Sequence, residues 1–176
     1  MQSDLEARAQ AFSEQAHAGQ RRKYTDEPYI VHPSAVAELV RSIPHSEEML
    51  AAAWLHDVVE DTETSLDTIA REFGDRVAGL VFQLTDVSRP GDGNRRIRKA
   101  LDRAHLAMAS TEAKTIKLAD LIDNSKSIVE RDPEFAKVYI REKAELLGVL
   151  CGGDTMLWSQ AADIVTKFLE REKNIT

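Results

Sequence analysis

The sequence predicts an all-α protein, and three observations lead to this fold class. Apolar residues recur every three or four positions along most of the 176 residues, which is the spacing of one helical face. No segment shows the alternation of apolar and polar residues that marks a half-buried strand. The 8 glycines and 5 prolines are gathered at a few places, so turn signals between helices are sparse. We therefore expect a compact helical bundle that forms a single domain over residues 1–176.

The first two predicted helices are separated by a basic loop. Apolar residues from Leu5 to Ala16 recur at helical spacing, and Gly19 marks the expected end of the first helix. Residues 20–31 are predicted to form the loop. The second helix is expected to begin at His32-Pro33, because proline is well tolerated in the first helical turn.

Residues that cap helices or end them mark the next three predicted helices. Ser46 is expected to open the third helix, which then passes through the apolar run at 51–55. Either Thr64 or Ser65 is expected to cap the fourth helix, which stops at Gly74. The fifth helix follows directly.

Two breaks divide the second half of the chain. Residues 86–94 contain one proline and two glycines, so they are predicted to form a loop. Ser110 or Thr111 is expected to cap the helix before residue 129. The sequence Cys-Gly-Gly at 151–153 predicts a helix break rather than a domain linker. Nine helices are expected in all, at about residues 5–19, 32–43, 46–57, 65–73, 76–84, 95–108, 111–129, 133–150 and 155–170.

Composition excludes several classes of protein. The chain has 23 Lys+Arg and 30 Asp+Glu, a formal net charge of −7, which disfavours binding to long nucleic acids. Its single cysteine, Cys151, excludes an internal disulfide framework and a cysteine-based zinc cluster. No apolar run approaches the roughly 20 residues that span a bilayer, and residues 1–14 do not resemble a signal peptide. We expect a soluble cytoplasmic protein without a membrane partner; the oligomeric state, a homo-oligomer included, stays open.

The segment 51–62, AAAWLHDVVEDT, carries the densest group of ionisable residues. At about 100° per residue, His56, Asp57, Glu60 and Asp61 fall in one sector of a helix. One interpretation is a solvated helix end with surface charges. The other is a helix that emerges into a cleft, and spacing alone does not choose between them.

Two other polar positions bear on that choice. His32 stands at a helix entry, where a capping role is the alternative to ligation. Asp120 lies on an otherwise apolar helix face, and Asn124 and Ser127 follow it at one and two turns. A buried Asp120 would need a cation or a hydrogen-bonded shell, whereas an exposed one would need neither.

Two histidines and two aspartates together would form a mixed nitrogen and oxygen site. Such ligands suit Mn, Fe, Co or Zn better than Ca or Mg. Water bound to a metal of this kind becomes acidic enough to act as a nucleophile near neutral pH.

The order His32, His56-Asp57, Asp120 resembles the metal-binding set of the HD-domain phosphohydrolases. More narrowly, the chain resembles the hydrolase domain of RelA/SpoT proteins and their small stand-alone relatives of the metazoan SpoT homologue type. This resemblance covers about residues 16–150. The segments that carry it are GQRRKY (19–24), PYIVHP (28–33), AWLHDVVEDT (53–62) and KLADLIDN (117–124).

The resemblance implies an HD-domain fold and roles for ten residues. The positions that match the family's metal ligands are His32, His56, Asp57 and Asp120. The carboxylates that match the pair thought to position or deprotonate the attacking water are Glu60 and Asp61. The positions that match its nucleotide contacts are Arg22, Lys23, Asn124 and Ser127. The metal implied is most often Mn²⁺.

The chain departs from the family pattern at several positions beside this set. Leu121 stands where Arg or Lys is usual, and Asp123 stands where His or Tyr is common. Such changes leave the ligands intact but can alter the groups that support them. The basic residues within 95–99, Arg95 and Arg96 among them, are interpreted as a solvated helix face or as a funnel for a polyphosphate. No role is assigned to Lys137.

The resemblance implies metal-dependent hydrolysis of the 3′-pyrophosphate of ppGpp or pppGpp, giving GDP or GTP and pyrophosphate. The expected partner is this small nucleotide, and no second, synthetase-like domain is expected in 176 residues. One alternative is the same chemistry on an adenine alarmone (ppApp) or on the 2′-phosphate of NADPH. Others are a non-catalytic nucleotide-sensing module and a structural helical protein with accidental motifs.

Overall fold

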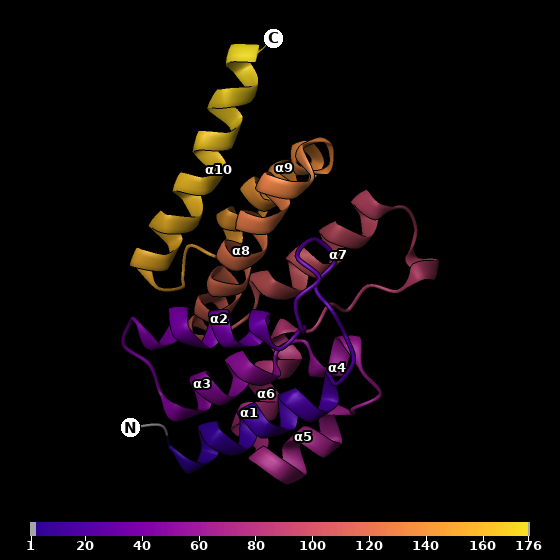
Figure 1. Cartoon of the computed structure of the whole chain (residues 1–176), viewed down its shortest axis with the longest axis vertical. Coiled ribbons are helices and arrows are strands. Elements are labelled where there is room, and N and C mark those ends of the chain that lie inside the picture. The colour runs from indigo at the N-terminus through magenta and orange to yellow at the C-terminus, as the bar shows by residue number, and fades with distance from the viewer. Residues whose placement is uncertain (1–2, 176) are drawn as a thin grey trace.

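The structure, a computed structural model, describes residues 3–175, which are helical with connecting loops (Figure 1). The prediction of an all-α protein is confirmed. The helices are α1 (Asp4–Ala16), α2 (Val31–Arg41), α3 (Glu47–Leu55), α4 (Val58–Asp61), α5 (Leu66–Phe73), α6 (Asp75–Leu84), the 3₁₀ turn η1 (Pro90–Asp92), α7 (Arg95–Ala107), α8 (Thr111–Arg131), α9 (Pro133–Val149) and α10 (Thr155–Ile175).

Each of the nine predicted helices is present, but one of them is divided. The helix expected to run through 46–57 ends at Leu55, and Asp57, with φ −98° and ψ −6°, separates it from the single turn of α4. His56 accompanies the break, because its Nδ1 turns back to the carbonyl of Ala53 at 2.8 Å. Valine, whose branched side chain lowers helix propensity, follows at positions 58 and 59.

Polar side chains cap most of the helices. The sequence left two capping residues possible for each of two helices, and the structure shows Ser65 capping α5 and Ser110 capping α8. Each such cap typically contributes about 1 kcal/mol, so the caps fix where each helix begins. The residues whose side chains accept a backbone N–H at the start of an α-helix are Ser3, Ser46, Ser65, Asn94, Ser110, Asp132 and Asp154.

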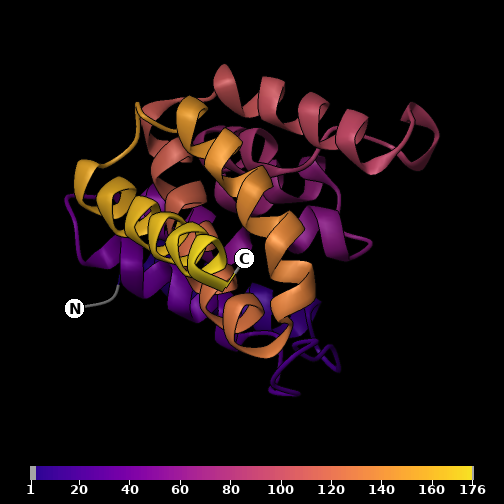
Figure 2. The same cartoon turned by 90° about the horizontal axis from the view of Figure 1, so that it is seen from above.

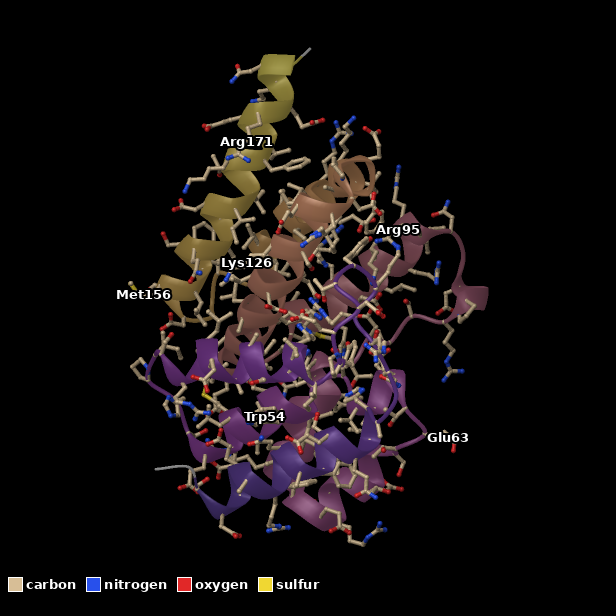
Figure 3. All side chains as sticks on the ribbon, in the orientation of Figure 1. Trp54, Glu63, Arg95, Lys126, Met156 and Arg171 are labelled. Carbon is tan, nitrogen blue, oxygen red and sulfur yellow. The ribbon has the colours of Figure 1, made fainter. Side chains whose placement is uncertain are left out.

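Two helices form the centre of the molecule. Every residue of α3 from Met49 to Leu55 is buried, and α3 packs against α1, α2 and α6. Helix α8 packs against α2, α3, α6, α9 and α10, so it joins the two halves seen in Figure 1. Figure 3 shows Trp54 of α3 pointing inward, where its Nε1 donates to Glu6 at 3.1 Å. The buried apolar side chains form one core that runs from α1 to α10.

Helices α9 and α10 pack against α8, and α7 packs against α9 and α6 (Figure 2). The predicted break at 151–153 lies between α9 and α10. At Gly153 a Cβ atom would lie 2.8 Å from Leu118 Cδ1 and 3.1 Å from the backbone of Lys114, so glycine allows this turn to approach α8 closely. Within residues 3–175, no helix is long and apolar enough to cross a membrane.

Candidate functional site

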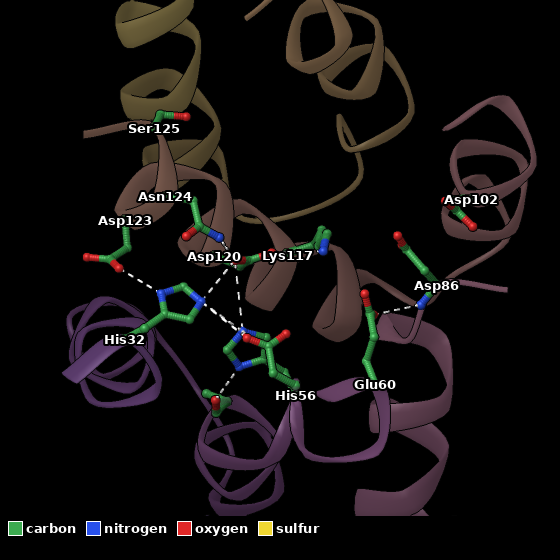
Figure 4. Close-up of polar contacts among 12 residues, drawn as sticks. His32, His56, Glu60, Asp86, Asp102, Lys117, Asp120, Asp123, Asn124 and Ser125 are labelled. Carbon is green, nitrogen blue, oxygen red and sulfur yellow. Dashed lines mark hydrogen bonds and ion pairs between the residues drawn. The ribbon is translucent and has the colours of Figure 1, made fainter. Parts of the chain in front are cut away.

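The four residues predicted to bind a metal lie together at the junction of three helices (Figure 4). His32 comes from the first turn of α2, His56 and Asp57 from the break between α3 and α4, and Asp120 from the middle of α8. His32 Nε2 lies 3.2 Å from Asp120 Oδ1 and 3.4 Å from Asp57 Oδ2, and His56 Nε2 lies 3.1 Å from Asp57 Oδ2. The helix break therefore aims adjacent residues of the chain at one point.

Three of these residues bring potential metal-ligand atoms close together. In the part of the chain that the structure describes, His32, His56 and Asp57 each offer a ligand atom within 4.8 Å of the others. Asp120 Oδ1 stands farther from His56, at 3.9 Å from its Nε2. Such a group of two imidazoles and a carboxylate can hold a divalent metal ion.

The hydrogen bonds of the two histidines direct both Nε2 atoms toward this point. His56 Nδ1 faces the carbonyl of Ala53 at 2.8 Å, and His32 Nδ1 faces Asp123 Oδ2 at 2.7 Å. Each Nδ1 therefore carries a proton, which leaves a lone pair on each Nε2 in the neutral ring. These two Nε2 atoms lie only 3.2 Å apart. Two facing lone pairs repel one another, so the arrangement fits a positive charge shared between them.

The electrostatics of the cluster favour the same positive charge. Burial opposes protonation of His32, but hydrogen bonds to Asp120, Asp123 and Asp57 outweigh burial and raise its pKa to about 11. Burial would likewise raise the pKa of Asp57, yet the two histidines hold that pKa well below its usual range. The carboxylates thus stay ionised, and the site strongly favours a cation at Nε2, whether a proton or a metal ion.

Asp120 is buried and has the hydrogen-bonded shell that its position requires. Lys117 Nζ lies 2.8 Å from Asp120 Oδ2, and Asn124 Nδ2 donates to Oδ1 at 2.6 Å. Burial would raise the pKa of Asp120, but Lys117 and the histidines keep it far below its usual value. Because Lys117 occupies one oxygen, the other faces His32. Sequence reasoning quoted Lys117 in a motif but gave it no role.

The two carboxylates predicted to activate water do not point the same way. Asp61 Oδ2 lies 3.1 Å from the Tyr29 hydroxyl, on the side of the metal ligands. Glu60 Oε2 accepts the backbone N–H of Asp86 at 3.1 Å, in the loop before α7. Burial and the neighbouring charge of Asp86 raise the pKa of Glu60 to about 7. Burial and Asp57 raise the pKa of Asp61. The expectation of one shared helical sector for residues 56–61 fails, because α3 ends at Leu55 and α4 begins at Val58. Within α4, Glu60 and Asp61 are adjacent and therefore point about 100° apart.

Tyr29 is a site residue that sequence reasoning missed. Its hydroxyl lies 2.6 Å from Asp57 Oδ2 and 3.1 Å from Asp61 Oδ2, so it connects a metal-ligand candidate to a catalytic candidate. The ring packs between His17 and His32, with centroid distances of 4.6 and 5.9 Å. Tyr29 lies in the turn that precedes α2, where the His32 N–H donates to its carbonyl at 2.9 Å, so helical spacing could not have identified it.

Three of the four predicted nucleotide contacts lie together on one side of the cluster. Arg22 Nη1 donates to Asn124 Oδ1 at 3.0 Å, while Nη2 lies 3.2 Å from Asp123 Oδ2 and 3.4 Å from Ser127 Oγ. Lys23 is directed elsewhere. Its Nζ donates to the Tyr24 hydroxyl at 3.2 Å.

A cavity of about 510 Å³ opens beside Glu60. Three basic residues of α7, Arg95, Arg98 and Lys99, line it together with Glu60 and Asp86. Within the described residues, Arg98 Nε is buried without a hydrogen-bond partner. The volume is in the range of small-molecule sites.

Other residues left open by the sequence lie outside this cavity. Arg96 lines a neighbouring hollow of about 330 Å³ between α7 and α9. Lys137 forms an ion pair with Glu134 on the surface, with Nζ and Oε1 2.8 Å apart. A larger hollow of about 650 Å³ lies against α1, α2 and α3, and contains none of the predicted site residues.

Most of the chain is similar to known proteins. Residues 9–147 match the family model of the HD domain. The chain is 37% identical over 171 residues to a probable guanosine-3′,5′-bis(diphosphate) 3′-pyrophosphohydrolase of Synechocystis, covering 94% of this chain and 22% of that protein. It is 39% identical over 120 residues to the guanosine-3′,5′-bis(diphosphate) 3′-pyrophosphohydrolase of Drosophila melanogaster, covering 66% of this chain and 65% of that one.

One solved structure is similar to this chain over nearly the whole length of both proteins. It is described as a metazoan ortholog of SpoT that hydrolyzes ppGpp, and it superposes with a TM-score of 0.84 at 30% identity. The match covers 94% of this chain and 96% of that one. By contrast, the chain spans about a fifth of the length of the bacterial relatives that it matches.

Proposed function

The chain belongs to the HD domain family, as its motifs predicted, and we propose that it is a metal-dependent hydrolase of guanosine alarmones. The reaction removes the 3′-pyrophosphate of ppGpp or pppGpp and leaves GDP or GTP. The observation that carries this proposal is the pair of Nε2 atoms of His32 and His56, 3.2 Å apart and flanked by two aspartates. The names of the similar proteins support the same reaction and substrate class.

We propose that His32, His56, Asp57 and Asp120 hold a divalent metal ion, and that this ion is Mn²⁺. Mixed imidazole and carboxylate ligands suit several transition metals, and Mn²⁺ is one of them. When bound, such a metal acidifies a water molecule and withdraws electron density from a phosphoryl oxygen. Lys117 keeps Asp120 ionised, and Asp123 and the carbonyl of Ala53 hold the two imidazole rings in the orientation that ligation requires.

The two proposed catalytic carboxylates have different roles toward the attacking water. Asp61, which the Tyr29 hydroxyl connects to Asp57, orients the water. Glu60, whose pKa of about 7 suits proton exchange near neutral pH, accepts its proton. The water oxygen attacks the phosphorus nearest the ribose and the bond from that phosphorus to O3′ breaks. O3′ then takes up the proton that Glu60 accepted from the water. Pyrophosphate and a nucleotide with a free 3′-hydroxyl are the products.

The nucleotide is held between the metal side and the basic face of α7. Arg22, Asn124 and Ser127 form a polar group beside His32, and Lys23 adds a charge at the edge of the same loop. Arg95, Arg98 and Lys99 give the cavity beside Glu60 a positive wall that suits phosphate groups. A small nucleotide as the partner and a cytoplasmic location are parts of this proposal. So is a single hydrolase domain over residues 1–176, in which the family resemblance is strongest over about 16–150 and α10 packs against α8 and α9.

A nucleotide screen tests the proposal. The metal-free protein would receive Mn²⁺ and, in parallel, ppGpp, pppGpp, ppApp or NADPH, and the products would be separated by anion-exchange chromatography. We expect GDP and pyrophosphate from ppGpp, at a higher kcat/KM than for the other nucleotides. Faster release of phosphate from NADPH would show that the preferred substrate is the 2′-phosphate of NADPH rather than an alarmone. Binding without turnover would favour a nucleotide-sensing module.

A further inference from the structure

We propose that Asp123 is a positioning residue that couples the nucleotide-binding loop to the metal centre, through hydrogen bonds to Arg22 and His32. The inference rests on the metal site and the activity proposed above. It concerns a position at which the chain departs from the family that it resembles, where His or Tyr is common. Neither of those side chains supplies the fixed negative charge of an aspartate.

A single oxygen of Asp123 serves both partners. His32 Nδ1 lies 2.7 Å from Oδ2, and Arg22 Nη2 lies 3.2 Å from the same atom. The His32 side chain is fully buried, and the side chains of Arg22 and Asp123 are 13% and 21% exposed. Figure 4 shows Asp123 beside the imidazole of His32, on the side away from His56. Water thus screens the interactions among these three side chains much less than it screens a surface ion pair.

On the metal side, Asp123 determines how His32 ligates. Its carboxylate accepts a hydrogen bond from Nδ1–H, which keeps the lone pair on Nε2 and makes that nitrogen a stronger ligand for a metal. His56 differs, because its Nδ1 faces only the neutral carbonyl of Ala53. Of the two imidazole ligands, His32 is therefore the one whose donor strength depends on an ionised side chain.

On the nucleotide side, Arg22 competes for the same carboxylate oxygen. Its guanidinium also contacts Asn124 and Ser127, which are proposed nucleotide contacts. A phosphate or base that draws Arg22 away leaves the full charge of Asp123 to His32 and strengthens metal binding. Because linkage is reciprocal, the bound metal then raises the affinity for the nucleotide.

Calorimetric titration of the metal-free full chain with Mn²⁺ tests this coupling. Asp123→Asn keeps the size of the side chain but removes its charge, and we expect the Kd for Mn²⁺ to rise by about 10–100-fold. Asp123→Glu retains a carboxylate and should recover part of the affinity. Asp163→Asn, an equal change of charge at an exposed position on α10, should bind Mn²⁺ as wild type does. With Mn²⁺ raised to saturation, Asp123→Asn should regain most of its kcat, as a defect in metal affinity requires.

A double-mutant cycle separates coupling from simple charge effects. Arg22→Gln should tighten Mn²⁺ binding several-fold in the wild-type background and change it much less when Asp123 is already Asn. Equal effects of Arg22→Gln in both backgrounds would overturn the coupling, as would Mn²⁺ affinity within twofold of wild type for a folded Asp123→Asn. If the wild-type protein itself binds no Mn²⁺, the proposed metal site fails first, which the same titration shows separately.

Discussion

The Nε2 atoms of His32 and His56 lie 3.2 Å apart, although Nδ1 of each ring already has its own hydrogen-bond partner. Helix α2 supplies one ring and the break after α3 supplies the other, so the fold itself forces the contact. Two neighbouring aspartates surround it. The repulsion between the two lone pairs, and between the two carboxylates, is offset when a cation binds there.

Mn²⁺ should stabilise the folded protein. At a free concentration 100-fold above its Kd, a ligand that binds only the native state adds about 2.7 kcal/mol to the free energy of unfolding. For a chain of this size, that corresponds to a rise in Tm of roughly 5–10 °C. Differential scanning fluorimetry with and without EDTA measures the shift. An unchanged Tm in millimolar Mn²⁺ would count against the metal site.

Asp57→Ala should abolish turnover while the protein stays folded. The variant loses a candidate ligand and the partner of Tyr29, so kcat/KM should fall by at least about 10²–10³-fold, as expected for loss of one electrostatic catalytic group. The Mn²⁺-dependent rise in Tm should disappear as well. Far-ultraviolet circular dichroism checks the fold, and Asp163→Ala serves as the surface control. Wild-type turnover by Asp57→Ala would rule out this site.

Tyr29→Phe tests the connection between Asp57 and Asp61. The change removes one hydroxyl that lies 2.6 Å from Asp57 Oδ2, and should cost about 1.5–3 kcal/mol in the free energy of unfolding. We expect kcat to fall about tenfold or more, because Asp61 loses its fixed orientation. Tyr24→Phe removes a comparable bond to Asp132, at 3.1 Å, and should reduce stability with much less effect on kcat. Equal kinetic effects of the two changes would contradict the proposed role of Tyr29.

Glu60 should link activity and stability to pH in opposite directions. Burial and Asp86 raise its pKa in the folded protein to about 7, above the ordinary value of 4.5. The native state therefore holds this proton more tightly than the unfolded state does, and the contribution of Glu60 to stability falls as pH rises from about 4.5 through 7. As a base, Glu60 must be ionised, so kcat should rise over the upper part of the same range.

Glu60→Gln should remove this pH dependence. Because Gln cannot ionise, the variant should be more stable than wild type at pH 8 and much less active. Urea unfolding of the metal-free protein at pH 5 and pH 8, compared between wild type and variant, measures the difference. A variant that loses stability equally at both pH values would show that Glu60 is ionised throughout.

Most of the fold could be predicted from the sequence, because local signals determine it. Helical spacing, serine caps and glycine stops predicted nine helices. The break at His56 and Asp57 could not be read in this way, since it accompanies the bond from His56 to a backbone carbonyl and the position of its ring against His32. That break places His56 and Asp57 outside the helical turn that carries Glu60 and Asp61, whose side chains diverge because adjacent residues of α4 point about 100° apart.

The ligand candidates could be predicted because their chemistry and order along the chain are distinctive. Their supporting groups depend on contacts between distant segments. Asp123 drew notice only as a departure from a pattern, and its partner Arg22 lies 101 positions away in the sequence. Lys23 was grouped with Arg22, but its ammonium lies over the ring of Tyr24, 4.8 Å from the centroid. Neighbouring positions in a loop do not reveal which way each side chain turns.

Hydrolysis of ppGpp in ¹⁸O-labelled water tests the central claim most directly. The metal-free protein would be given Mn²⁺ and ppGpp, and the products analysed by mass spectrometry beside a sample with EDTA. If a metal-activated water attacks the phosphorus nearest the ribose, a single turnover places one labelled oxygen in pyrophosphate and none in GDP. The EDTA sample should form neither product. Label in the 3′-hydroxyl of GDP, release of inorganic phosphate in place of pyrophosphate, or equal turnover in EDTA would contradict the account.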